Sequence, residues 1–140
     1  FYKPDNLKKA YELFGKSPSW ALNLCLGCCS RMPGGEKNVT EMIESFAPKG
    51  KIAYSHFRDV QGTVPNFTEC FIGDGNYDPA EVVALLVENN FDGFLLDDHL
   101  PKMDGDSPWS HVAAPMPSAT CRASSACWSS GRSRRAPTVP

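Results

Sequence analysis

Residues 51–59 read KIAYSHFRD, and the fold is decided by this stretch. Its apolar and small residues predict a buried strand. The strand ends in a polar group made of His56, Arg58 and Asp59. Loops that leave the carboxyl ends of parallel strands converge on one crevice, where α/β folds keep their chemistry. Strand ends are also wet, so a purely structural interpretation of the polar group stays open.

Length and composition indicate one soluble globular domain: the chain has 140 residues, of which 41% are hydrophobic and 21% charged. No apolar run approaches the roughly 20 residues of a membrane span, and no basic-then-apolar leader opens the chain. We therefore expect a cytoplasmic protein without membrane or nucleic-acid partners. Three of the six cysteines (Cys25, Cys28 and Cys29) lie too close together for a disulfide framework, which favours a reducing compartment.

The charge divides the chain into two parts. Residues 1–111 carry a net charge of −6, whereas residues 112–140 carry +4 and no acidic residue. The second part has neither helical nor strand periodicity and is rich in Ala, Ser, Pro and Arg. This composition predicts a folded domain at residues 1–111 followed by a disordered tail at residues 112–140.

Helices and strands alternate along the folded part. The patterns predict a helix at 5–14 capped by Asp5, a strand at 20–26, a helix at 39–46, the central strand, a helix at 78–88 capped by Asp78, and a strand at 91–96. Residues 60–66 are expected to be a loop and residues 67–72 a brief extended piece. Such alternation is typical of a parallel sheet covered by helices. Three strands cannot close a barrel, so more strands or a partner would be needed to cover the edges.

Cys25 and Cys28 form a Cys-x-x-Cys motif, which has a redox or zinc interpretation. The motif is predicted to end a strand and enter a loop, whereas a thioredoxin-like site opens a helix directly. No second cysteine pair follows at the spacing of a zinc site. A non-catalytic metal-binding or redox module that uses Cys25 and Cys28 remains the alternative function.

Chemically useful side chains follow each of the three predicted strands. Cys25 ends the first, His56 ends the second, and Asp98 with His99 follows the third. Thiolate, imidazole and carboxylate are groups that a divalent metal ion accepts as ligands. A parallel sheet brings these strand ends to the same face, so the sequence predicts a divalent-metal site there.

Several segments together resemble the C-terminal part of the mannonate dehydratase family, which has a xylose-isomerase-like TIM barrel. The segments that carry this resemblance are residues 25–27, 54–60, 67–69, 75–78 and 97–103. The resemblance covers most of residues 20–111 and implies an α/β fold, a partial (β/α)8 TIM barrel of about three C-terminal βα units. It also implies a hydro-lyase that converts D-mannonate to 2-dehydro-3-deoxy-D-gluconate in hexuronate (glucuronate) catabolism, with homo-oligomeric full-length members.

The resemblance also implies roles for individual residues. Cys25, His56 and Asp98 would hold a divalent metal, Mn²⁺ in most members with Fe²⁺ as the other candidate, and His99 would act as the catalytic acid or base. Arg58 is expected either to hold the carboxylate of the sugar acid or to pair with Asp59. The chain departs from the family in two ways: Cys28 stands where a small hydroxyl residue is usual, and the family's remaining histidine ligand lies on an earlier strand.

The resemblance gives the tail a second explanation. If one C is restored after the codon of His111, permitted GC-rich codons for residues 111–128 also encode RGRAHAIGYMQGLLRVL. This sequence favours a helix and resembles what the family has at this point, including a Tyr thought to assist catalysis. We therefore expect residues 112–140 to be a frameshift product and the fragment itself to be inactive.

Overall fold

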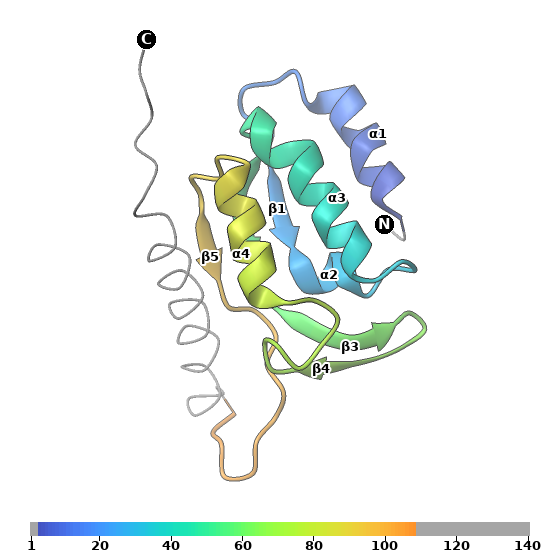
Figure 1. The fold of residues 1–140 in the computed structure, drawn as a ribbon, viewed down its shortest axis with the longest axis vertical. Coiled ribbons are helices and arrows are strands. Elements are labelled where there is room, and N and C mark those ends of the chain that lie inside the picture. Colours follow the sequence, from blue (N-terminus) through green and yellow to red (C-terminus); the bar gives the residue numbers. More distant parts are fainter. Residues whose placement is uncertain (1–2, 109–140) are drawn as a thin grey trace.

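In the computed structural model, which describes residues 3–108, a layer of helices covers a parallel sheet and a β-hairpin lies at one end of that sheet (Figure 1). In chain order the elements are α1 (Pro4–Phe14), β1 (Leu22–Cys25), α2 (Leu26–Ser30), α3 (Glu36–Phe46), the 3-10 helix η1 (Ala47–Lys49), β2 (Ile52–His56), β3 (Asp59–Thr63), β4 (Asn66–Cys70), α4 (Pro79–Glu88) and β5 (Phe94–Leu96). No helix within residues 3–108 is long and apolar enough to cross a membrane. The tail predicted at residues 112–140 lies outside the described residues.

The sheet has the strand order β1-β2-β5, and both pairs of neighbours are parallel, as the sequence pattern predicts. Cys25 pairs with His56 across β1 and β2, and His56 pairs with Leu96 across β2 and β5. The carboxyl ends of all three strands therefore lie at the same end of the sheet, which we call its carboxyl edge. Strands β1 and β5 point toward the hairpin (Figure 1). This register places the residues that follow the three strands next to one another.

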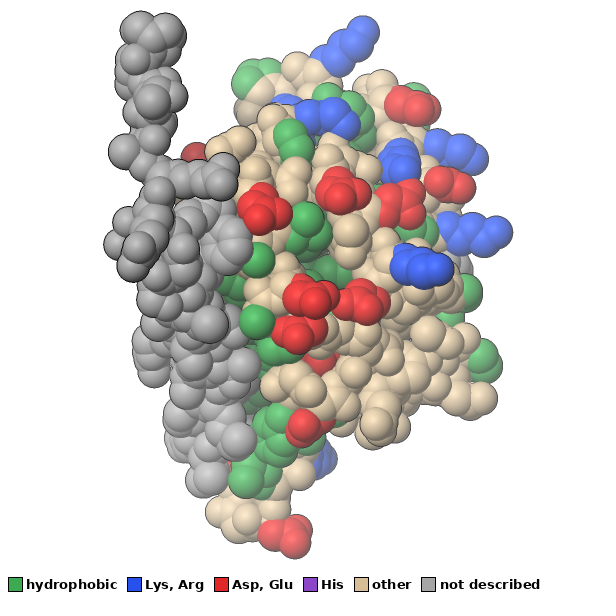
Figure 2. Space-filling view, viewed as in Figure 1, with side chains coloured by type: hydrophobic (Ala, Val, Ile, Leu, Met, Phe, Trp, Pro, Cys, Tyr) green, Lys and Arg blue, Asp and Glu red, His purple; other side chains and the backbone are tan. Residues whose placement is uncertain are grey.

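The hydrophobic core lies between the sheet and the helical layer. Its largest fully buried side chains are Leu24, Leu26, Val39, Met42, Ile43, Phe46, Phe57, Val60 and Leu86. The outer face of the helices carries mostly charged and polar side chains with small apolar areas between them (Figure 2). Helices α3 and α4 thus turn their apolar stripes toward the strands, as amphipathic helices on a sheet do.

The ends of two helices test the predicted caps. Asp78 caps α4 as expected, because its Oδ1 accepts hydrogen bonds from the backbone N–H of Ala80 at 2.7 Å and of Glu81 at 3.4 Å. The predicted cap at Asp5 is wrong. Helix α1 begins at Pro4 with Lys3 as its N-cap, and Asp5 lies in the first turn, where a carboxylate favours the positive end of the helix dipole.

Two predicted loops are regular structure instead. Helix α2 begins immediately after Cys25, and residues 60–66 contain most of strand β3, the turn and the first residue of strand β4 in an antiparallel hairpin. In the hairpin, Val60 pairs with Glu69 and Gly62 with Phe67. Gly62 has φ +87°, a conformation that glycine adopts at no steric cost. The hairpin extends the structure beyond the sheet edge at which the three parallel strands end.

Asp59 organises the loop that leads from β4 to α4. Its side chain is fully buried, and its two oxygens accept hydrogen bonds from the backbone N–H groups of Val60, Gly73, Gly75 and Asn76 at 2.8–3.3 Å. Burial raises the pKa of Asp59, and the four N–H donors partly oppose this shift. Gly75 allows the close approach, since a Cβ there would lie 2.3 Å from Asp59 Oδ1.

We predict that Asp59→Asn lowers the free energy of unfolding by roughly 3 kcal/mol, because an amide NH2 would face two backbone N–H donors in place of an accepting oxygen. Asp74→Asn is the matched control: it removes the same charge from the exposed part of the same loop and should change stability by less than about 0.5 kcal/mol. Urea unfolding of both variants measures the difference. Equal stabilities would contradict the organising role of Asp59.

Candidate metal centre

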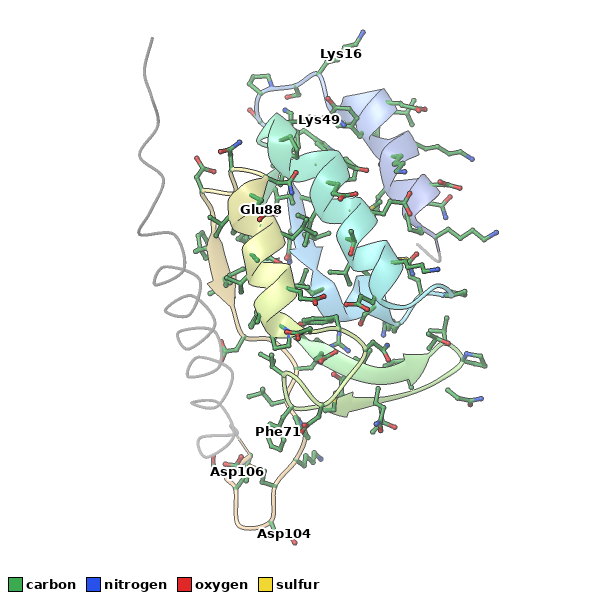
Figure 3. The ribbon with its side chains drawn as sticks, in the orientation of Figure 1. Lys16, Lys49, Phe71, Glu88, Asp104 and Asp106 are labelled. Carbon is green, nitrogen blue, oxygen red and sulfur yellow. The ribbon has the colours of Figure 1, made fainter. Side chains whose placement is uncertain are left out.

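The three predicted metal ligands meet where the parallel strands end. One ligand atom each from Cys25, His56 and Asp98 lies within 4.8 Å of the other two. Asp98 Oδ2 lies 3.3 Å from His56 Nδ1 and 3.9 Å from Cys25 Sγ. This edge of the sheet lies toward Phe71 and Asp104, whereas Lys16 and Lys49 lie toward the other end of the helical layer (Figure 3).

The chemistry of this cluster suits a divalent cation. It offers one sulfur, one imidazole nitrogen and one carboxylate oxygen, a donor set used for zinc and for redox-active first-row metals. The side chains of His56 and Asp98 are each 24% exposed, so an ion and a small ligand can reach them from solvent. Three protein ligands leave coordination positions open for water or substrate, as catalytic sites require.

His99 lies on the rim of this cluster. Its side chain is 62% exposed, with Nε2 3.7 Å from Asp98 Oδ1 and Nδ1 3.7 Å from Glu69 Oε1. The imidazole can thus meet a molecule that arrives from solvent while it stays beside the ligand cluster. Its predicted role in proton transfer fits this position and remains a prediction.

Asn23 is a neighbour of the cluster that the sequence did not reveal. Its side-chain amide lies 3.3 Å from His56 Nε2, while His56 Nδ1 faces Asp98. A partner on the second ring nitrogen fixes the orientation of a metal-binding histidine. Asn23 precedes Cys25 by two residues on the same strand, so both side chains project from the same face of the sheet.

Arg58 lies next to the cluster, and its side chain is only 3% exposed. The alternative that it pairs with Asp59 is wrong, because the Asp59 carboxylate is occupied by backbone N–H groups. The partner of Arg58 is Glu69 on β4: Arg58 Nε donates to Glu69 Oε2 at 2.8 Å, and Nη2 donates to Oε1. The predicted contact between Arg58 and a substrate carboxylate is untested.

The Cys-x-x-Cys motif opens a helix, contrary to prediction. Cys25 is the N-cap of α2, and Cys28 lies in the first turn of that helix. A hydrogen bond from the Cys25 thiol lowers the pKa of Cys28 to about 6, with burial opposing the shift and Arg31 and Arg58 supporting it. The same interaction raises the pKa of Cys25, and burial raises it further. Without metal, Cys28 is the more acidic thiol of the pair.

Fold and site together define an α/β protein with a candidate divalent-metal centre at the carboxyl edge of a parallel sheet. The model of the family D-mannonate dehydratase (UxuA) matches residues 3–133. The chain therefore belongs to the D-mannonate dehydratase family, and the resemblance found in the sequence is confirmed.

Individual relatives agree with the family match. The chain is 28% identical over 117 residues to a mannonate dehydratase from Geobacillus thermodenitrificans, an alignment that covers 79% of this chain and 29% of that protein. It is 26% identical over 108 residues to one from Lactococcus lactis subsp. cremoris, covering 71% of this chain and 27% of that protein. The chain thus spans less than a third of the length of these curated relatives.

A solved structure supports the fold. The mannonate dehydratase from Streptococcus suis serotype 2 superposes with a TM-score of 0.73 at 22% sequence identity, covering 98% of this chain and 42% of that chain. This likeness shows that the mixed α/β arrangement is the one found within a mannonate dehydratase.

Proposed function

We propose that Cys25, His56 and Asp98 bind a divalent metal ion, Mn²⁺ or Fe²⁺, and belong to the machinery that dehydrates D-mannonate to 2-dehydro-3-deoxy-D-gluconate in hexuronate catabolism. The observation that carries this proposal is the convergence of three different metal-ligating groups within 4.8 Å in a chain of the D-mannonate dehydratase family. The reaction class is that of a hydro-lyase. A cytoplasmic location and a homo-oligomeric full-length protein remain predictions.

The architecture we propose is a segment of about three βα units from a (β/α)8 barrel. Support comes from the all-parallel order β1-β2-β5 and from exposed apolar side chains on β5, where Phe94 is 57% and Leu96 40% exposed. Parallel sheets are normally covered on both faces. A cavity of about 400 Å³ also opens beside the edge strand β1, lined in part by Leu22, Asn23 and Cys25. In a complete barrel a further strand would pair with this edge.

In the proposed reaction the metal ion and His99 have different roles. Dehydration of a 2,3-dihydroxy acid removes the weakly acidic proton next to the carboxylate and expels the hydroxyl group at C3. When bound, the metal ion would neutralise charge on the substrate oxygens. His99 would move the proton, since an imidazole can both accept and donate one and the ring is exposed beside Asp98. Glu69 Oε1 lies 3.7 Å from the other ring nitrogen.

A redox or metal-binding module built on the two cysteines is the second candidate. It is favoured by the position of Cys25 and Cys28 at the start of α2 and by the lowered pKa of Cys28. Such a module would use both thiols, whereas the proposed dehydratase cluster uses only Cys25 of the two. The two candidates therefore differ in what the loss of Cys28 does.

We predict that Cys25→Ser weakens binding of Mn²⁺ or Zn²⁺ by about 100-fold or more, because a metal ligand is lost. Cys28→Ser, which is the matched control, should leave the dissociation constant within about twofold. Titration of the purified chain with each metal measures both values. Tight zinc binding that is lost with either cysteine would favour the two-thiol module instead.

A further inference from the structure

The guanidinium group of Arg58 touches two of the three proposed metal ligands at once. Its Nη1 lies 3.7 Å from Cys25 Sγ and 3.9 Å from Asp98 Oδ2, and also 3.5 Å from the Sγ of Cys28, which is not a proposed ligand. We propose that Arg58 is a positioning residue of the metal centre, which holds Cys25 and Asp98 in their relative places and is itself held by Glu69. The inference rests on the proposed metal site, and it gives Arg58 a role other than contact with the substrate.

Glu69 fixes the orientation of the guanidinium. The carboxylate accepts from both Nε and Nη2, which is the two-point pairing that the planar guanidinium group favours. With that edge engaged, Nη1 is the part of the group that faces the cluster. Because Glu69 belongs to β4, the pair links the hairpin to the sheet edge that carries the ligands.

The backbone and the aliphatic stem of Arg58 also have defined contacts. Its backbone carbonyl accepts a hydrogen bond from the Tyr77 hydroxyl at 2.8 Å. Its aliphatic stem passes over Gly27, where a Cβ would lie 3.0 Å from Arg58 Cγ. The path of the stem thus depends on the absence of a side chain at Gly27, one residue before Cys28.

Charge and burial argue for a positioning role. A buried arginine requires paired anions, and Arg58 has the carboxylate of Glu69 and, within 4 Å, that of Asp98. A substrate carboxylate would have to displace Glu69 from a side chain that is only 3% exposed. The positive charge instead balances the anionic ligands that would surround a divalent ion.

Titration with Co²⁺ tests the proposal, because cobalt bound to a cysteine thiolate gives a charge-transfer absorption that reports on Cys25 separately from metal affinity. We expect Arg58→Met, which keeps the stem and removes the charge, to weaken Co²⁺ and Mn²⁺ binding roughly 10- to 100-fold and to diminish that absorption. Glu69→Gln should also weaken metal binding, and the double variant should bind metal no more weakly than Arg58→Met alone.

The matched control is Arg31→Met. Arg31 stacks on Phe67, with Cζ 4.9 Å from the ring centroid, and this change should alter metal affinity less than twofold.

The outcomes separate this inference from the proposed function. Wild-type-like affinity and absorption in Arg58→Met would overturn the positioning role, whether or not the chain has any dehydratase activity. Additive losses in the double variant would also overturn it, since Glu69 is proposed to act through Arg58. Failure of the wild-type chain to bind Co²⁺ would overturn both the metal site and this inference. If Arg58→Met does not fold, Glu69→Gln decides the question: unchanged affinity in that variant contradicts the proposal.

Discussion

Replacement of His99 by Asn, made at the matching position of a full-length relative, is expected to lower turnover of D-mannonate by about 100-fold or more and to leave bound metal unchanged. The reason lies in the geometry of the rim: His99 is 62% exposed and lies beside Asp98 without belonging to the group of mutually close ligand atoms. Asparagine keeps a polar side chain of similar reach, but it cannot take up or release a proton near neutral pH.

The measurement pairs kcat with elemental analysis of the purified protein. The matched control is the same substitution at the position of His56, which lies inside the cluster and should lose both metal and activity. Loss of metal from the His99 variant would reassign that residue as a ligand. Full turnover with full metal content would remove it from the proton-transfer step.

Topology explains why the ligand cluster could be predicted from the sequence. Once three apolar runs are assigned to a parallel sheet, their carboxyl ends must share an edge, so Cys25, His56 and Asp98 are neighbours wherever the exact strand boundaries fall. The boundaries themselves were less accurate: the third strand was expected at 91–96 and is Phe94–Leu96. Errors of this size do not alter which edge carries the cluster.

The pairing of Arg58 with Glu69 could not be predicted from the sequence, because it depends on the hairpin. Glu69 is 11 residues away along the chain and reaches Arg58 only because β3 and β4 form a hairpin. Residues 59–63 contain one large apolar residue, Val60, which gives little signal for a strand. Long-range pairing, which local periodicity does not encode, decides both the hairpin and the ion pair.

Helix α2 was missed because its sequence is a poor helix former. Residues 26–30 read LGCCS, a run with an internal glycine and no charged residue to favour a first turn. Packing overrides this preference: Leu26, Gly27, Cys29 and Ser30 are all buried. The same turn brings Cys28 within 3.5 Å of Arg58 Nη1 and puts the cysteine pair at the start of a helix, as in a redox motif.

The 140-residue chain is expected to show no measurable dehydration of D-mannonate. By resemblance the family uses a further histidine ligand from an earlier strand, and the chain spans less than a third of its curated relatives. Catalytic geometry tolerates displacements of only about 0.5 Å, so ligands on the proposed partial barrel should hold a metal without aligning the substrate. A shifted reading frame after residue 111 would also remove the family's Tyr and the helix predicted in the alternative frame.

Incubation of the purified chain with D-mannonate and Mn²⁺, followed by detection of 2-dehydro-3-deoxy-D-gluconate, tests this expectation, with a full-length relative as the positive control. Steady product formation that follows chain concentration would show that the inactivity prediction is wrong. The encoding DNA tests its cause independently. An upstream open frame that encodes further strands, and a second frame that resumes RGRAH after His111, would identify an interrupted dehydratase gene, whereas codons incompatible with that frame would contradict the frameshift.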